Sequence, residues 1–169
     1  MTLGVIRKWP AFLRSPVAVA ALAAVFVATL GASATDVGPW YQALRKPSWQ
    51  PPDLLFGPVW TLIYGLTALA GVKAWRAAPD RRTRERIIVL FAANALLNVL
   101  WSELFFGLHR PDWALWEAAP FLASIAVLIA VVRPLSRTGA WALAPYLAWV
   151  AFATVLNLAV VRLNASFGA

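Results

Sequence analysis

The sequence contains no cysteine and only one histidine, His109. Without cysteine there is no disulfide scaffold, thiolate metal site or cysteine nucleophile, and one histidine cannot form a histidine-based metal cluster. Charged residues are also scarce, at 13% of the chain against about 25% in soluble domains. Neither a phosphate-binding loop nor a Ser-His-Asp set can be assembled from the residues present. We therefore expect no metal site and no conventional catalytic site.

Apolar residues are abundant and make up 62% of the 169 positions. Soluble domains contain about 45–50%, and a soluble globule of this size could not bury so much apolar surface behind so few charges. The sequence therefore indicates an integral membrane protein. A net charge of +8 and a pI of 11.1 are also found in nucleic-acid-binding proteins. Here, however, the basic residues gather in short gaps between apolar runs, so we expect no nucleic-acid partner.

Five stretches are long and apolar enough to cross about 30 Å of hydrocarbon as helices. They cover residues 16–34, 57–75, 87–108, 113–132 and 140–163. Pro120 is expected to kink the fourth of them. The expected fold is all-α, a transmembrane domain of five helices that occupies residues 16–169 and follows a basic N-terminal extension, residues 1–15. Membrane lipid is one expected partner.

Lys and Arg are divided unevenly between the two sides of the membrane that these spans define. Eleven fall on the side of the N-terminus and four on the opposite side. Because loops rich in Lys and Arg stay inside, the count predicts an N-terminus on the inner face. The expected location is a multi-pass position in a bacterial cell membrane.

The first span has two interpretations. It follows the basic extension and ends in Ala32-Ser33-Ala34, as a cleavable signal peptide would. Its apolar run is long for such a peptide, which favours a retained helix. Small residues recur along it at four-residue spacing, and they are Ala20, Ala24, Ala28 and Ala32. This ridge permits close packing within the protein or, as the alternative, a dimer seam.

The loop between the first two spans is rich in aromatic residues and proline. It carries Trp40, Tyr41 and Trp49, and prolines such as Pro51. Because proline fixes φ and removes backbone donors, we expect a stiff segment without regular structure. Its aromatic residues either form a belt at the membrane interface or fold with the loop over the helix bundle as a lid.

Polar and aromatic residues recur at helical spacing on three of the predicted spans. These stripes consist of Trp60, Tyr64, Thr67 and Gly71 on the second span, Asn94, Asn98 and Trp101 on the third, and Tyr146, Trp149, Ala153 and Asn157 on the fifth. Amides that face lipid are costly, so the stripes are expected to face inward. One interpretation is that the asparagines only hydrogen-bond neighbouring helices. The other is an aromatic-walled pocket for a large, flat, mostly apolar ligand.

Two further polar residues are candidate functional groups. Glu103 is interpreted as the one acid well inside a span, and it either reaches the interface at its helix end or takes part in a proton relay. His109 is expected to be a solvated loop residue.

Several motifs resemble the tryptophan-rich sensory protein or translocator protein family, known as TspO/MBR. They are Trp40-Tyr41, Lys46-Pro47-Ser48-Trp49, Phe56-Gly57-Pro58-Val59-Trp60, Asn98-Val99-Leu100-Trp101-Ser102 and Pro145-Tyr146-Leu147-Ala148-Trp149. The resemblance covers roughly residues 36–164. Glu103 departs from the family pattern, which usually has proline there, and the segment from Leu156 to Arg162 lacks the tyrosine of the sterol-recognition pattern.

The resemblance implies a five-helix bundle, frequently a homodimer, whose first loop folds over the mouth of an internal pocket. Family members bind porphyrins such as protoporphyrin IX, sterols in some cases, and benzodiazepine-type drugs. Lid residues implied in this chain are Trp40, Tyr41 and Pro51. Pocket-wall residues implied are Trp60, Asn94, Asn98, Trp149 and Ala153, and the stripes add Tyr64, Trp101 and Tyr146 to the expected ligand-binding set.

Three functions follow as hypotheses. The leading one is a membrane receptor or regulator that binds protoporphyrin IX, haem or similar flat hydrophobic ligands and requires no cofactor. The second is a light-dependent enzyme that degrades porphyrin, in which Trp60 and Trp149 would be the reacting indoles. The third is a transporter of tetrapyrroles or other apolar metabolites, for which the sequence shows neither internal repeats nor paired broken helices.

Overall fold

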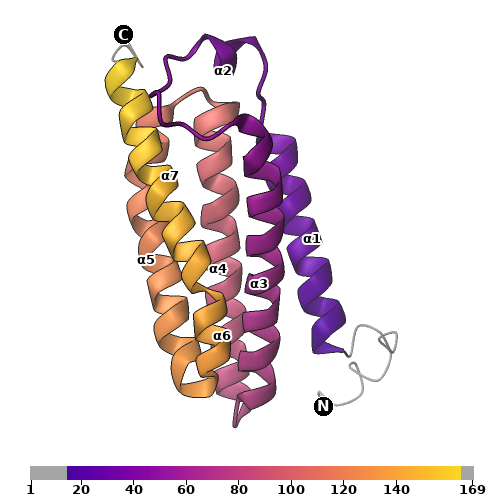
Figure 1. Ribbon diagram of the computed structural model, residues 1–169. Coiled ribbons are helices and arrows are strands. Elements are labelled where there is room, and N and C mark those ends of the chain that lie inside the picture. The colour runs from indigo at the N-terminus through magenta and orange to yellow at the C-terminus, as the bar shows by residue number, and fades with distance from the viewer. Residues whose placement is uncertain (1–14, 165–169) are drawn as a thin grey trace.

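The computed structural model describes residues 15–164, and the basic extension expected for residues 1–15 lies, except for Ser15, outside the described residues. Between residues 15 and 164 the regular structure is entirely helical. Five of its helical segments are long and apolar enough to cross a membrane. The prediction of an all-α membrane bundle with five spans is therefore confirmed (Figure 1).

The described residues form nine helical elements, eight of which build the five spans. These are α1 (Pro16–Ala34), α2 (Pro39–Ala43), η3 (Asp53–Leu55), α3 (Phe56–Ala77), α4 (Arg81–Ser102), η4 (Glu103–Gly107), α5 (Pro111–Leu135), α6 (Arg137–Ala142) and α7 (Ala144–Leu163). The spans are α1, η3 with α3, α4 with η4, α5, and α6 with α7. The short helix α2 lies in the long connection between the first two spans.

Local sequence signals explain where several helices begin. The side chain of Ser15 accepts a hydrogen bond from the Ala18 backbone N–H at the start of α1, and Asp80 accepts one from Thr83 at the start of α4. Such caps satisfy backbone donors that have no partner inside the first helical turn. Ser136 caps α6 in the same way through Gly139. Each spanning helix that follows these caps therefore starts at a residue type typical of a helix N-terminus.

Two spans contain irregular turns. At the end of the third span, η4 is a π-helical turn in which the Leu108 N–H donates to the Glu103 carbonyl over 2.8 Å. The fifth span was expected as one helix from residue 140, but it begins at Arg137 and is interrupted at Leu143. Pro145 explains the interruption because it has no N–H to continue the α-helical ladder. The fourth span, in contrast, remains a single α-helix that contains Pro120.

The helices form a ring in which α1 packs against α3 and α4, α3 against α6, and α5 against α4, α6 and α7. One face of α5 supplies much of the core. Its buried residues follow helical spacing and include Ala114, Ala118, Phe121, Ile125, Leu128 and Val132. Large apolar side chains such as Leu62 and Val89 are exposed on the outside, as expected where lipid surrounds the bundle. Figure 1 shows α1 at the edge of the bundle, leaning away from α3 toward its N-terminal end.

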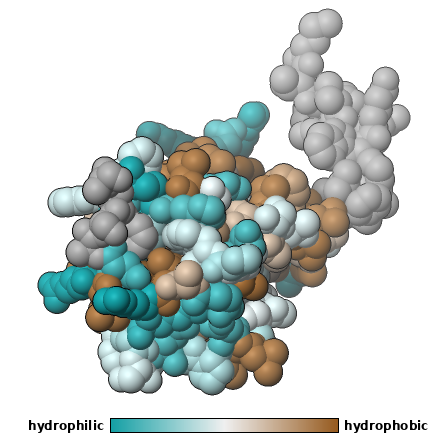
Figure 2. All heavy atoms as spheres, turned by 90° about the horizontal axis from the view of Figure 1, so that it is seen from above, coloured by the Kyte–Doolittle hydropathy of each residue, from teal (hydrophilic) through white to brown (hydrophobic). Residues whose placement is uncertain are grey.

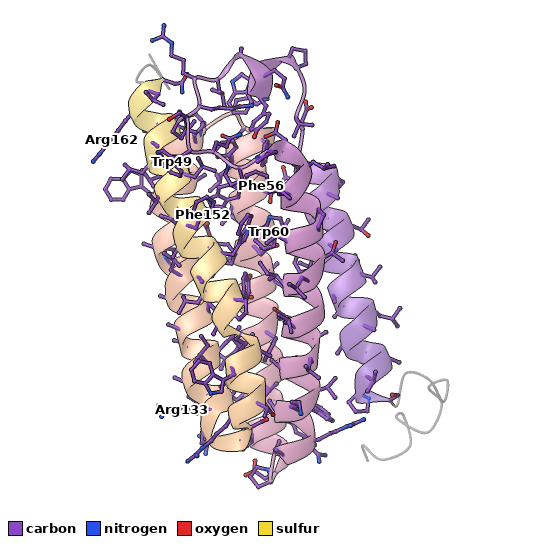
Figure 3. The ribbon with its side chains drawn as sticks, viewed as in Figure 1. Trp49, Phe56, Trp60, Arg133, Phe152 and Arg162 are labelled. Carbon is purple, nitrogen blue, oxygen red and sulfur yellow. The ribbon has the colours of Figure 1, made fainter. Side chains whose placement is uncertain are left out.

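The two ends of the bundle differ. We call the end with the long connection between α1 and α3 the lid end, and the end with the α3–α4 and α5–α6 connections the basic end. Figure 2 looks down on the lid end, where hydrophilic side chains cover much of the surface and apolar ones lie between and around them. Arg162 lies at the lid end and Arg133 at the basic end (Figure 3).

Candidate ligand-binding site

A hydrogen-bonded network joins four helices in the middle of the bundle. The Tyr64 hydroxyl donates to Asn98 Oδ1 over 2.9 Å, and the Tyr146 hydroxyl donates to Asn94 Oδ1 over 3.1 Å. Asn94 Nδ2 in turn donates to the Ser124 hydroxyl over 2.8 Å. Both asparagines are 3% exposed. The structure thus brings together four of the predicted site residues, which come from α3, α4 and α7. Asn94 and Asn98 hydrogen-bond neighbouring helices, as one of the two sequence-based interpretations expected.

Toward the lid end, aromatic rings from α3, α7 and the loop form two sets of contacting rings, one around Trp149 and one around Trp60, which together are called the aromatic cluster. This aromatic cluster consists of Trp49, Phe56, Trp60, Tyr64, Tyr146, Trp149 and Phe152. Trp60 stacks on Tyr64 with ring centroids 5.5 Å apart and lies edge-on to Tyr146 at 6.2 Å. Figure 3 shows Phe56 and Trp60 on α3, and Phe152 on α7, in the half of the bundle nearer the lid. Trp60 and Trp149 therefore pack among other aromatic rings and against the hydrophobic core.

Trp149 packs against two aromatic rings but leaves its indole N–H without a hydrogen bond among the described residues. It lies edge-on to Phe56 at 5.6 Å and tilted against Phe152 at 5.5 Å. Its indole Nε1, however, is buried and has no hydrogen-bond partner among the described residues. A buried N–H without a partner is costly, so this donor is available to an acceptor group that enters the cluster.

Three more inward-facing polar side chains lack partners within residues 15–164, namely Thr67, Asn157 and Glu117. Asn157 on α7 is 2% exposed and Glu117 on α5 is 7% exposed, and neither the amide nor the carboxyl group makes a hydrogen bond there. Val160 of α7 and Ala114 of α5 belong to one buried cluster with Tyr41 and Phe105 near the lid end. Asn157 precedes Val160 by one helical turn and Glu117 follows Ala114 by one turn. Because α5 and α7 run antiparallel, both residues lie one turn further from the lid end than that cluster. Unpartnered buried groups of this kind are rare and mark sites where a ligand or water binds.

The interpretation of Glu103 as the one acid well inside a span was wrong. Glu103 is exposed at the end of the third span, whereas Glu117 is the buried acid and was missed. A signal was present, because Glu117 falls at helical spacing between Ala114 and Phe121 on the apolar face of the fourth span.

The long connection, residues 35–55, folds back on itself and is called the lid loop here. Tyr41 donates its hydroxyl proton to Asp53 Oδ1 over 3.0 Å, and Gln50 Nε2 donates to the same oxygen over 3.0 Å. Lys46 Nζ lies 3.6 Å from the centre of the Tyr41 ring and 3.9 Å from Asp53 Oδ2. Burial, followed by the hydrogen bond to Asp53, raises the pKa of Tyr41 to about 12, so its hydroxyl stays protonated at neutral pH. Pro51, also implied as a lid residue, is half-buried in this loop.

Two contacts fasten the lid loop to the bundle. The Arg45 backbone N–H donates to Asn164 Oδ1 over 2.9 Å, and Asn164 Nδ2 donates back to the Arg45 carbonyl over 2.8 Å. On the other side, the Trp40 ring stacks on His109 with centroids 4.1 Å apart. His109, expected as a solvated loop residue, is exposed and has a positive φ of 54°. The loop therefore bridges the end of α7 and the connection between the third and fourth spans.

Beneath α2 lies a second group of rings that includes a predicted pocket residue. Trp101 stacks on Phe105 with centroids 5.1 Å apart, and Trp40 lies edge-on to Phe105 at 6.1 Å. Tyr41 packs against Phe106 at 5.6 Å. Trp101 therefore supports the lid loop from below, and Ala153 occupies a half-buried position on α7.

A cavity of about 480 Å³ lies between α1, α3 and α4. This volume falls in the range of about 300–1,000 Å³ that is typical of small-molecule sites. Four predicted site residues line it, namely Tyr64, Asn94, Asn98 and Tyr146, together with Ala20, Ala24 and other small or apolar residues. The cavity runs from this network toward the basic end, so it meets the aromatic cluster at Tyr64 and Tyr146. Gly31, which sequence reasoning missed, allows α1 to approach Tyr64, since a Cβ there would lie 3.3 Å from the hydroxyl.

Within residues 15–164 no group of three or more His, Cys, Asp or Glu residues is arranged to hold a metal ion. The polar groups that face inward are amides, phenols, the hydroxyls of Thr67 and Ser124, an indole N–H and one carboxyl. They can bind the polar atoms of an organic ligand, and the aromatic cluster can bind its flat apolar body.

Fold and site together define a class: a multi-pass membrane protein of five helices, with an aromatic interior and a lid loop across one end. The chain belongs to the TspO/MBR family, whose model matches residues 17–163. It is 35% identical over 125 residues to the tryptophan-rich protein TspO of Chlorobaculum tepidum, an alignment that covers 74% of this chain and 79% of that one. The TspO protein of Archaeoglobus fulgidus is 38% identical over 134 residues, covering 79% and 85%. The human translocator protein is 34% identical over 128 residues, covering 74% and 75%.

Proposed function

We propose that the protein is a membrane receptor that binds porphyrins and similar flat, hydrophobic ligands in the bundle interior beneath the lid loop. One observation supports this most strongly. Within the described residues, the buried indole Nε1 of Trp149, a member of the aromatic cluster, and the buried amide of Asn157 on the same helix have no hydrogen-bond partner. A folded protein rarely leaves such atoms unsatisfied without a functional reason.

The chemistry of the cluster suits a tetrapyrrole. Indole and phenol rings offer faces and edges against which a large planar π-system packs favourably. A porphyrin also carries acceptor groups that the Trp149 N–H and the Asn157 amide can bind. Because the bundle excludes water, each hydrogen bond formed there removes the cost of a buried unsatisfied group. Protoporphyrin IX and haem are therefore the proposed ligands, and the lid loop would limit their exchange at this end.

The ligand proposal is tested by titrating the protein in lipid nanodiscs with protoporphyrin IX and recording the absorbance of the pigment. We compare the double variant Trp60→Leu/Trp149→Leu with Trp116→Leu/Trp141→Leu. The second pair is the matched control because Trp116 and Trp141 are 83% and 75% exposed. Each pair removes two indoles, but only the first removes rings of the aromatic cluster.

Saturable binding is expected for the unaltered protein and for the control pair, with affinity reduced about tenfold or more in the Trp60/Trp149 pair. Loss of two buried aromatic contacts of about 0.5–1.5 kcal/mol each totals about 1–3 kcal/mol, which corresponds to about 5- to 150-fold weaker binding. Equal affinity of the two double variants, or uptake no greater than by protein-free nanodiscs, would show that the ligand does not bind in the cluster.

We further propose that the N-terminus faces the inside of a bacterial cell membrane. The described Lys and Arg residues support this, because eight lie toward the basic end and four toward the lid end. The lid loop would then face outward. The homodimer implied by the family resemblance stays a prediction.

A further inference from the structure

The cavity between α1, α3 and α4 has walls unlike those of the aromatic cluster. Small side chains from all three helices form much of it, including Ala24, Gly71 and Ala95. At its inner end the Tyr64 hydroxyl already donates a hydrogen bond to the side-chain oxygen Oδ1 of Asn98. The walls therefore offer apolar contact and few free polar groups, which suits a flexible hydrocarbon chain.

The cavity is also open to the lipid side of the bundle. Val19 of α1 and Ile88 of α4 both line it and are 47% and 54% exposed. In a membrane, an apolar groove with such exposed margins faces acyl chains rather than water. An occupant can therefore enter sideways from the bilayer without passing the lid loop.

A cation marks the end of the groove at the membrane surface. Trp75 lines the groove at the basic end, and the Arg84 guanidinium lies 5.3 Å above the centre of its ring. Arg84 precedes Ile87 and Ile88 by one helical turn, so it lies on the groove face of α4. No carboxylate within the described part of the chain forms an ion pair with Arg84, which is free to bind an anion.

The length of the groove matches one leaflet of a bilayer. Arg84 and Asn98 are separated along α4 by about 21 Å at 1.5 Å per residue. Half of a bilayer with its headgroup region measures about 20–22 Å. A lipid whose head group reaches Arg84 would therefore place its chain end near Asn98.

We propose that this groove is a lipid site that binds the acyl chain of a membrane lipid with an anionic head group, and that Arg84 selects the head group. The groove meets the porphyrin site proposed above at Tyr64 and Tyr146, but lipid binding there does not depend on porphyrin binding. The contacts are apolar along the chain and ionic at the head, so the charge of the head group, and not the chain, provides the selectivity.

The experiment uses phosphatidylglycerol and phosphatidylcholine that carry the same diazirine-labelled acyl chain. Each probe is added to nanodiscs of unlabelled phosphatidylcholine that contain the full-length protein, and the cross-linked peptides are identified by mass spectrometry after illumination. Arg84→Gln removes the guanidinium on the groove face, and Arg82→Gln is its control on the opposite face. Ala95→Phe fills the groove, and Ala93→Phe places the same ring on the exposed side of α4.

Phosphatidylglycerol is expected to label the groove segments of α1, α3 and α4 about fivefold more than phosphatidylcholine, the factor for one basic residue near a head group. Arg84→Gln should abolish that preference and Arg82→Gln should keep it. Ala95→Phe should reduce labelling of the α1 and α3 segments, whereas Ala93→Phe should not.

The proposal is overturned if both lipids label the groove equally in the unaltered protein, or if labelling is spread evenly around the bundle. It is also overturned if Ala95→Phe and Ala93→Phe behave alike, or if a second copy of the chain covers the groove and excludes both probes. Since Arg84→Gln changes an exposed side chain, it gives an answer even if Ala95→Phe does not fold. Porphyrin titration of Arg84→Gln separates the two sites, because the affinity for protoporphyrin IX should be unchanged.

Discussion

At the scale of single residues, two asparagines that look alike in the sequence have different environments. Asn94 accepts a hydrogen bond from Tyr146 and donates one to Ser124. Asn157 is equally buried but has no partner within the described chain. Asn94 therefore stabilises the packing of α4 against α5 and α7, whereas Asn157 carries an unsatisfied amide at the proposed ligand site.

This difference predicts opposite effects of the same substitution. Asn94→Leu should lower the free energy of unfolding by about 1–2 kcal/mol, since it breaks two interhelical hydrogen bonds. Asn157→Leu should leave the ligand-free protein as stable or make it more stable, because no bond is lost and an unsatisfied group is removed. Unfolding by dodecyl sulfate in mixed micelles measures both. Equal destabilisation by the two variants would mean that Asn157 has a partner inside the protein.

Helical spacing made it possible to predict which side chains of the site face the interior of the bundle. Tyr64, Asn98 and Tyr146 share inward faces because amides and phenols in lipid are costly. Spacing could not show which hydroxyl meets which amide, since that depends on how far each helix is shifted along its neighbour. It also did not distinguish Glu103 from Glu117, where position near a helix end decides exposure.

At the scale of elements, the lid loop is held by contacts between segments far apart in the chain. The pair of hydrogen bonds between the Arg45 backbone and the Asn164 side chain joins positions 119 residues apart. The proline content of the loop predicts stiffness but not this partner, because nothing local in the sequence encodes a long-range hydrogen bond. The spans, in contrast, follow from hydropathy alone, and the π-helical turn η4 and the break before Pro145 are the irregularities that hydropathy did not predict.

Loss of the two hydrogen bonds between Arg45 and Asn164 should make the lid loop more accessible to protease. In Asn164→Ala, trypsin is expected to cleave the Arg45–Lys46 bond several times faster, because the Arg45 backbone loses both hydrogen bonds to α7. Thr154→Ala is the control, since that hydroxyl bonds only within its own helix, to the Val150 carbonyl. An unchanged cleavage rate in Asn164→Ala would show that other contacts, such as Trp40 with His109, suffice to hold the loop.

At the scale of the whole molecule, the bundle presents two kinds of interior to two kinds of ligand. The half near the lid is aromatic and carries unpartnered polar atoms, while the groove toward the basic end is lined by small apolar residues and ends at a free guanidinium. Tyr64 and Tyr146 lie where the two meet. The proposed receptor would thus bind a flat pigment beneath the lid loop and an anionic lipid from the inner leaflet.

The most direct measurement locates the pigment by its own photochemistry. In air-saturated buffer, illuminated protoporphyrin IX converts dissolved oxygen into reactive oxygen, which adds to nearby indoles, and mass spectrometry after a short exposure identifies which tryptophans have reacted. If the pigment binds in the aromatic cluster, Trp60 and Trp149 will be oxidised before Trp116 and Trp141, although the latter pair is far more exposed. Oxidation of Trp116 and Trp141 first, as pigment dissolved in the surrounding lipid would produce, would contradict a binding site inside the bundle.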